Sequence, residues 1–187
     1  MPSASRSPAR DRTLTQVLEY VAAHGLADAS LRDVAAAIGS SHRMLLYHFG
    51  SREGLVAAIV QRIEADQRGL LATLAEEATS PTDLVRLQWA TLSDPAMWPF
   101  VRLFFEATTL ALHGRPGTEG FLDSLTDTWL RDAGAVAEDM GVQVGEAELR
   151  LGVALLRGLL LDAVASGDPT GPTRALERYL TLWESAG

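Results

Sequence analysis

The segment between Gly39 and Gly50 carries the side chains best suited to hydrogen bonding with a nucleic acid. It reads SSHRMLLYHF and places imidazole, guanidinium and phenol groups close together. The fork of Arg43 can bind both acceptors on the major-groove edge of guanine. Tyr47 and His48 can donate hydrogen bonds to phosphate oxygens. These residue types therefore predict a helix that contacts bases with its first half and phosphates at its edges.

Two short helices separated by a glycine turn are needed to present such a segment. Ser30 is suited to cap a first helix, in which Asp33 can answer it as the acid of a capping box does. Leu31, Val34 and Ile38 give this helix one apolar face. A glycine, residue 39, follows where a left-handed residue would end the helix. The order helix, glycine turn and basic helix is typical of a helix-turn-helix DNA-binding motif.

The stretch from Ser30 to Leu55 resembles the DNA-binding domain of the TetR family of transcriptional regulators. In that family a recognition helix ends in an aromatic-His-Phe run, followed by a serine, a basic residue, Glu and Leu. This chain has Tyr47-His48-Phe49 and then Ser51-Arg52-Glu53-Gly54-Leu55, although it has Leu46 where the family commonly has tyrosine. The residues and the resemblance together predict these DNA contacts: Arg32, Ser41, His42, Arg43, Met44, Tyr47, His48 and Arg52.

Composition is consistent with a globular protein and narrows its class. Hydrophobic residues make up 47% of the 187 residues, and there is no cysteine, which excludes disulfides and thiolate chemistry. The net charge is −8, but residues 1–62 hold seven arginines against five acidic residues, whereas residues 63–187 hold nine against nineteen. A basic N-terminal part suits contact with phosphate. No signal peptide or membrane span is found, and we expect a cytoplasmic bacterial protein.

Apolar periodicity predicts an all-α protein of about nine helices. We expect a flexible arm at residues 1–10, with Arg6 and Arg10 able to reach DNA, and a three-helix DNA-binding domain at residues 11–56. A C-terminal helical domain for ligand binding and dimerisation is expected at residues 57–187. One of its helices is predicted from about Thr118 to Met140. No catalytic, metal-binding or cofactor-binding motif is found, so we expect neither an enzyme nor a cofactor.

Aromatic residues are concentrated in the middle of the chain and suggest an apolar ligand cavity with a few polar groups. The resemblance implies a small, substantially apolar effector. Packing in an ordinary core is the alternative explanation for the same residues. The predicted pocket residues are Trp89, Trp98, Arg102, Phe105, Glu106, Thr109, His113, Phe121 and Trp129.

The last two predicted helices are rich in leucine, and Gly152 and Gly158 would allow a close approach between helices. In proteins of the TetR family the final two helices pair with those of a second subunit. Completion of the monomer's own core is the alternative. The predicted dimer-interface residues are Leu155, Leu156, Leu159, Leu176, Tyr179, Leu180 and Trp183.

The leading interpretation is a homodimeric, ligand-responsive repressor that binds double-stranded DNA at a palindromic operator. A second interpretation retains DNA binding but has no ligand. A third is a helical binding protein or enzyme with a vestigial DNA-binding domain.

Overall fold

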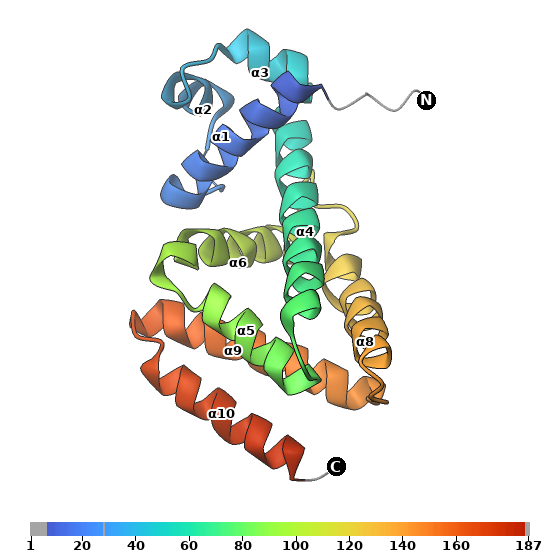
Figure 1. Ribbon diagram of the computed structural model, residues 1–187. Helices are drawn as coiled ribbons and strands as arrows, with labels where there is room; N and C mark the ends of the chain where they lie inside the picture. Colours follow the sequence, from blue (N-terminus) through green and yellow to red (C-terminus); the bar gives the residue numbers. More distant parts are fainter. Residues whose placement is uncertain (1–6, 28, 186–187) are drawn as a thin grey trace. The chain divides into compact units, whose positions relative to one another are not determined.

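The computed structural model describes residues 7–27 and 29–185, and within these it is helical with no strand (Figure 1). This confirms the predicted all-α class. The α-helices are α1 (Pro8–His24), α2 (Leu31–Ala37), α3 (His42–Phe49), α4 (Arg52–Glu77), α5 (Pro81–Leu92), α6 (Trp98–Leu112), α7 (Phe121–Asp123), α8 (Trp129–Asp139), α9 (Glu146–Ser166) and α10 (Thr170–Glu184). A 3-10 turn at Pro95–Met97 precedes α6, and a π-helical turn at Ser124–Thr128 joins α7 to α8.

The chain forms two compact units, and neither is one continuous segment. The head unit contains the residues up to Glu64 together with Arg102–Leu122, and the body unit contains Ala65–Val101 and the residues from Asp123 onward. Helix α4 therefore contributes residues to both units. The boundary expected after residue 56 does not separate these units, because part of α6 and the loop after it belong to the head unit.

Serine side chains begin the first three helices of the head unit. The hydroxyl of Ser7 accepts a hydrogen bond from the backbone N–H of Arg10 at 3.2 Å, and Pro8 occupies the first turn of α1. Residues 8–10 are therefore helical where the sequence suggested an arm, and Arg6 lies outside the described residues. Ser30 Oγ accepts from the N–H of Asp33 at 3.2 Å and lies 2.5 Å from its carboxylate. This confirms the predicted cap of α2.

The core of the head unit fixes α3 against α2. Leu45 is fully buried and Phe49 is nearly so, as are Val34 and Ala35 of α2. Gly39 has φ +65 in the turn between the two helices, a conformation that glycine adopts without steric cost. Burial of Leu45 and Phe49 on one side leaves the opposite side of α3 in solvent.

The loop after α6 approaches α4 closely at Gly117. A Cβ on Gly117 would overlap the carbonyl oxygen of Glu53 and would lie 3.0 Å from Cβ of Val56. Gly117 also has φ +91, so both its conformation and its surroundings call for glycine. Phe121, at the end of this segment, is 1% exposed and packs edge-to-face on Phe104. The segment is thus an integral part of the head unit's core.

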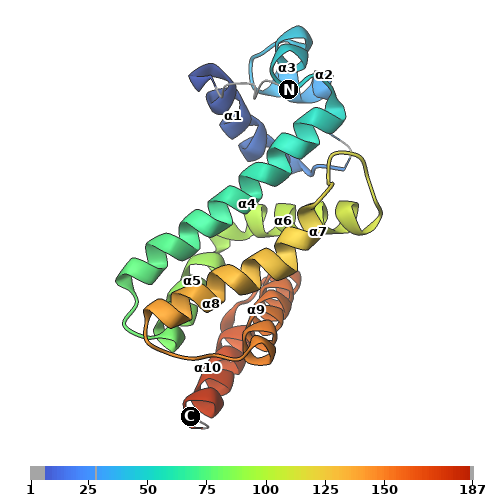
Figure 2. The ribbon, with the colours of Figure 1, turned by 90° about the vertical axis from the view of Figure 1, so that its right-hand side faces the viewer.

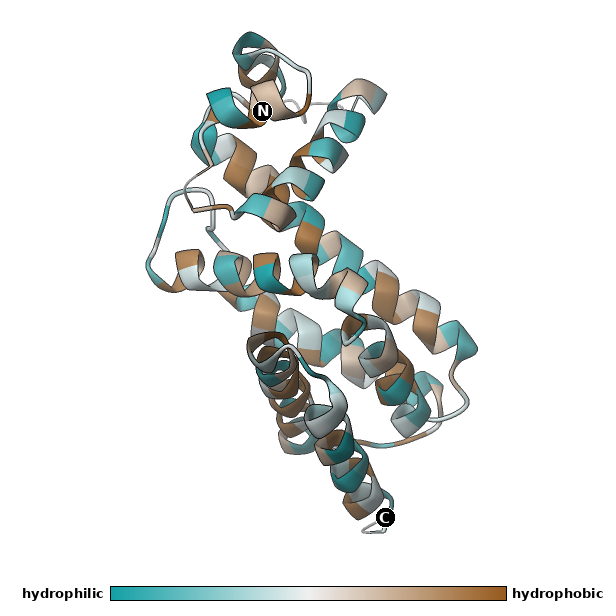
Figure 3. Ribbon diagram, turned by 90° about the vertical axis from the view of Figure 1, so that its left-hand side faces the viewer, coloured by the Kyte–Doolittle hydropathy of each residue, from teal (hydrophilic) through white to brown (hydrophobic). Residues whose placement is uncertain are grey.

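The body unit is built around the end of α4, with α5, α8, α9 and α10. Leu71, Leu74 and Leu84 form a buried cluster on which Trp129 and Val136 of α8 pack. Figure 2 shows α8 lying along the C-terminal part of α4. Helices α9 and α10 form an antiparallel pair, and α9 is apolar along much of its length (Figure 3).

The predicted helix from Thr118 to Met140 is interrupted in its first half. A π-helical turn occupies Ser124–Thr128, and within it the carbonyl oxygen of Leu125 accepts a hydrogen bond from Arg157 Nη2 at 2.7 Å. Burial lowers the pKa of Arg157. A charged side chain from α9 therefore reaches into the interior of the body unit.

Candidate functional site

The N-terminal half of α3 is open to solvent. Ser41, His42 and Arg43 are all exposed, Met44 is 43% exposed, and Tyr47 is 79% exposed. Their side chains lie opposite the buried face of the helix. The surface of α3 thus offers a guanidinium, an imidazole and a phenol to a partner.

The beginning of α3 is held by its own cap. Ser41 Oγ accepts a hydrogen bond from the backbone N–H of Met44 at 3.1 Å. This bond occupies one lone pair of the hydroxyl oxygen and leaves the O–H group free to donate. Ser41 therefore positions α3 and can still contact a phosphate oxygen.

The other end of α3 is fastened to α1 by Arg10. Arg10 Nε donates a hydrogen bond to the carbonyl oxygen of His48 at 3.2 Å, and its guanidinium lies 5.1 Å from the centre of the Phe49 ring. His48 is half-buried, with its ring between those of Tyr47 and Phe49. Arg10 therefore acts inside the head unit, where the sequence had suggested an arm reaching for DNA.

Arg52 binds the loop between α1 and α2. Its Nε donates to the carbonyl oxygen of Ala29 at 3.2 Å, and its Nη2 donates to that of Ala27 at 2.5 Å. A guanidinium presents five donors, so groups remain for a further contact. The arrangement gives Arg52 a structural role that the predicted phosphate contact did not include.

Glu106 of α6 binds the same loop from the other side. Its carboxylate accepts hydrogen bonds from the backbone N–H groups of Leu26, at 2.8 and 2.9 Å, and of Ala27, at 2.6 Å. These amide groups follow the end of α1. Glu106 and Arg52 together hold the α1–α2 loop by its amides and its carbonyls.

A basic hollow lies on the head unit beside this loop. Three predicted DNA-contacting residues, Arg32, His42 and Arg52, line it together with Arg115. Glu53 also lines it and supplies a negative charge; its pKa is lowered by hydrogen bonding at the start of α4. The structure thus brings together residues from α2, α3, α4 and the loop after α6.

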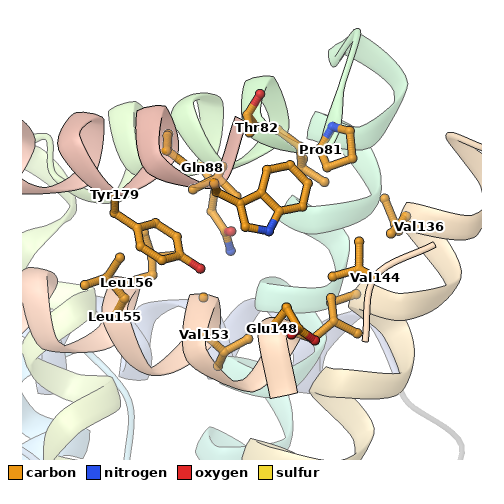
Figure 4. A pocket seen from close by; sticks show the side chains of 18 of the residues that line it. Pro81, Thr82, Gln88, Val136, Val144, Glu148, Val153, Leu155, Leu156 and Tyr179 are labelled. Atoms are coloured by element: carbon orange, nitrogen blue, oxygen red, sulfur yellow. The ribbon is translucent and has the colours of Figure 1, made fainter. Parts of the chain in front are cut away.

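The body unit contains an apolar cavity of about 130 Å³ between α5, α8, α9 and α10 (Figure 4). Trp129 and Trp183 line it with leucine and valine side chains. The polar lining groups include Gln88, Glu148 and Tyr179. The cavity has the composition of a small-molecule site, mostly apolar with a few polar groups.

Trp129 is the one predicted pocket residue in the lining of this cavity. Trp89 is buried, and its Nε1 donates to Thr173 Oγ1 at 2.9 Å, which ties α5 to α10. Trp98 Nε1 donates to the carbonyl oxygen of Ser93 at 3.0 Å. Both indole groups satisfy their donors within the body unit and stabilise its helices.

The other predicted pocket residues belong to the head unit. Arg102, Thr109 and His113 are exposed, and the ring of His113 lies 2.8 Å from the carbonyl oxygen of Thr109. Phe105 packs edge-to-face on Phe104, and the buried ring of Phe121 packs there too. With Glu106 engaged on the α1–α2 loop, these residues do not gather around the cavity of the body unit.

Several predicted interface residues line the cavity instead. Leu156, Leu176 and Leu180 are buried within the body unit and belong to the lining, as do Leu155, Tyr179 and Trp183. Leu159 is half-buried. The apolar stripe that was assigned to a second subunit therefore packs largely within the chain.

Residues 18–59 match the family model for bacterial regulatory proteins of the tetR family. The match covers the end of α1, the helix-turn-helix and the start of α4. The head carries a TetR-family domain. Its exposed α3 occupies the position of the recognition helix in the TetR-family pattern.

Solved structures extend the likeness to the fold of the whole chain. A TetR-family transcriptional regulator from Rhodococcus sp., so described in its crystal structure, is 21% identical, with a TM-score of 0.73 over 92% of this chain and 96% of that one. The fatty acid degradation regulator FadR from Bacillus halodurans is 18% identical, with a TM-score of 0.66 over 94% and 96%. The multidrug binding protein EbrR, complexed with imidazole, is 20% identical, with a TM-score of 0.65 over 92% and 95%. No curated protein sequence matches. The chain has the fold of TetR-family transcriptional regulators.

Within residues 7–27 and 29–185, no group of three or more His, Asp or Glu side chains is placed to hold a metal ion. Among the helices described, none is long and apolar enough to cross a membrane.

The sequence did not indicate Arg115 or Glu148 as site residues. Arg115 belongs to a loop whose residues show no periodicity, so nothing in the sequence places it beside Arg32. Glu148 lies in the first turn of α9 beside another acidic residue, Glu146, and no pattern in the sequence distinguishes the two. The TetR-family pattern covers neither region.

Proposed function

We propose that the protein is a ligand-responsive transcriptional repressor that binds a palindromic operator as a homodimer. The observation that carries this proposal is the exposed N-terminal half of α3 in a TetR-family domain. Such a helix enters the major groove, where base edges can be read. Because bacterial DNA lies in the cytoplasm, we expect the protein to act there.

Within this proposal Arg43 and Met44 contact bases, and residues around them contact the phosphate backbone. Arg43 is exposed near the start of α3, as a guanine-binding arginine must be. Tyr47 reaches outward and His48 is held by neighbouring rings. Arg32 and His42, which share the basic hollow, are suited to bind the phosphate backbone beside the groove.

Helices α9 and α10 offer a surface for the second subunit. The exposed face of α9 contains Leu151, Ala154, Gly158, Leu161 and Ala165, at the alternating three- and four-residue spacing of a helix-pairing stripe. Leu151 is 57% and Leu161 is 52% exposed. We infer that this stripe, rather than the buried leucines first predicted, forms the interface. A dimer also supplies the two half-sites that a single short helix lacks.

The apolar cavity of the body unit supports control by a small molecule. EbrR was solved with imidazole, so a protein of this fold binds a small ligand. An effector that favours one arrangement of the dimer would lower operator affinity by preventing both half-sites from being bound together. Helix α4, which contributes to both units, is the candidate link. The cavity favours this mechanism over the alternative of a regulator without a ligand.

The test is selection of bound DNA from a random library, followed by a gel shift with the selected sequence. We expect an inverted repeat, tight binding by the wild type, and a loss of roughly 1–3 kcal/mol in binding free energy per half-site for Arg43→Ala. Arg131→Ala changes an exposed arginine of α8 in the body unit and should bind as the wild type does. Failure to enrich any sequence would contradict the proposal and favour a helical binding protein or enzyme with a vestigial head.

A further inference from the structure

The cavity of the body unit contains three polar groups without a partner in the protein. Gln88 of α5, Glu148 of α9 and Tyr179 of α10 all line it. No hydrogen bond joins their side chains to another described residue, whereas neighbouring Thr82 pairs with Ser80 at 3.2 Å. Figure 4 shows the Gln88 amide and the Tyr179 hydroxyl directed into the same space. Unpaired polar groups that converge on an apolar space indicate a ligand.

Gln88 is the most informative of the three because it is almost fully enclosed. The residue is 8% exposed, and no hydrogen bond joins its amide to another described residue. Because no enclosed side-chain N or O atom in the described part of the chain lacks a partner, the amide atoms must keep access to the open space of the cavity. A primary amide both donates and accepts, so it can pair with a hydroxyl, an amide or an amine. Buried polar groups are nearly always hydrogen-bonded in folded proteins. The amide of Gln88 is therefore placed to bind the polar group of a ligand.

Glu148 and Tyr179 give the cavity its electrostatic character. Burial raises the pKa of Tyr179, and the negative charge of Glu148 raises it further, so the phenol stays neutral. The carboxylate of Glu148 is exposed and lies against Gly145, where a Cβ would overlap it. One negative charge thus faces the cavity.

No positive charge balances it. The residues that line the cavity in the described part of the chain include no arginine, lysine or histidine. A carboxylate or phosphate on a ligand would lose its hydration without gaining a cation, and Glu148 would repel it. An ammonium group would be attracted by Glu148, and a neutral hydroxyl could pair with Gln88.

We propose that the effector is an apolar molecule with a neutral or cationic polar group, bound by Gln88 and Glu148, and that anionic ligands are rejected. This inference rests on the proposed ligand-responsive function and adds the chemical class. It separates this chain from a regulator that senses a carboxylate. The apolar lining takes the body of the molecule, and the two side chains select its polar end.

Three probes with the same eight-carbon tail test the selection: octylamine, octanol and octanoate. Binding is followed by tryptophan fluorescence, because Trp129 and Trp183 line the cavity, and by calorimetry. At about pH 8 the amine is cationic and the acid anionic. We expect octylamine and octanol to bind at least about tenfold more tightly than octanoate, a difference of about 1.4 kcal/mol. Equal or tighter binding of octanoate would overturn the inference, as would no binding by any of the three.

Two variants assign the selection to residues. Glu148→Gln should weaken the binding of octylamine until its affinity equals that of octanol. The same change should reduce the discrimination against octanoate. Gln88→Leu should weaken the binding of octanol by about tenfold, because the hydroxyl group of octanol would then be buried without a hydrogen-bond partner. Glu146→Gln is the control, because Glu146 lies in the same first turn of α9, pairs with Arg150 at 3.0 Å, and does not line the cavity. Unchanged selectivity in Glu148→Gln would show that the carboxylate does not choose the ligand.

The selected operator separates this inference from the proposed function. If octylamine binds in the cavity with the expected preference but leaves DNA binding unchanged, the ligand class holds and regulation through this cavity fails. If octanoate binds best and releases the operator, the regulation holds and the inferred class is wrong.

Discussion

At the scale of single residues, the α1–α2 loop shows how polar side chains can position a site without touching its partner. Arg52 donates to three of the loop's carbonyls, and Glu106 accepts from two of its amides. Amides and carbonyls left unpaired near the surface would turn to water and loosen the loop. The loop leads directly into α2, so its order is transmitted to the helix-turn-helix.

Glu106→Ala is expected to lower the free energy of unfolding by about 2 kcal/mol, because hydrogen bonds to a charged acceptor are lost. Chemical denaturation measures this change. Glu138→Ala, at an exposed position of α8, is the control and should change stability by less than about 0.5 kcal/mol. Operator binding by Glu106→Ala should fall as the α1–α2 loop loosens. A variant as stable as the control would show that the loop does not depend on this carboxylate.

A second residue-scale prediction concerns the phenol of Tyr179. Its folded pKa is raised by burial and by Glu148, so ionisation should occur at higher pH in the native protein than in the unfolded chain. The native state then holds its proton longer, and the stability from this group is present below the unfolded pKa and is lost as pH rises through the folded value.

Absorbance of phenolate during a pH titration tests this. Replacement of Glu148 by Gln should lower the pKa of Tyr179 part of the way, because burial is the larger cause and remains. Tyr179→Phe identifies which step of the titration belongs to this residue. No downward shift in the Glu148 variant would contradict the electrostatic coupling at the cavity.

At the scale of the elements, most helices could be predicted because their signals are local. Ser30 and Asp33 predict a helix cap, and apolar residues at helical spacing predict the buried side of α3. The contacts of Arg52 and Glu106 could not be predicted, since backbone amides and carbonyls carry no sequence pattern. Periodicity likewise showed that α10 buries one face without showing what covers it, so Leu176 and Leu180 were assigned to a second subunit.

The π-helical turn before α8 is an element that depends on a distant side chain. Arg157 of α9 donates to the carbonyl oxygen of Leu125 within this turn. We expect Arg157→Met to lower the free energy of unfolding by about 1–3 kcal/mol, because a buried carbonyl loses its donor. The charge removed is itself poorly solvated, which keeps the loss at the lower end of this range.

Thermal unfolding by calorimetry measures the change, which corresponds to a melting temperature lower by several degrees. Arg150→Met is the matched control on α9, since Arg150 is exposed and pairs with Glu146 on the surface. Its effect should stay below about 1 kcal/mol. Equal effects in the two variants would mean that the π-helical turn does not need the guanidinium.

At the scale of the whole molecule, the proposed homodimer depends on the exposed stripe of α9. Leu161→Glu places a charge in that stripe and should shift the protein to monomers in sedimentation or light scattering, because desolvation of a carboxylate opposes association. Operator affinity should fall with it. Leu112→Glu is the control, because Leu112 is 69% exposed and lies outside α9 and α10. A dimer that survives the Leu161 change would place the interface elsewhere.

The two segments of the head unit are synthesised at different times, because the first part of the body unit lies between them in the sequence. Its core includes Phe104 and Phe121, and the loop after α6 packs Gly117 on α4. The ribosome makes α5 and residues 98–101 before it reaches these groups, and a bacterial chain grows at roughly 5–20 residues each second. The helix-turn-helix is therefore synthesised several seconds before residues 102–122, which complete the core of the head unit. Interaction with DNA in this interval would involve a domain whose α1–α2 loop has not yet received Glu106.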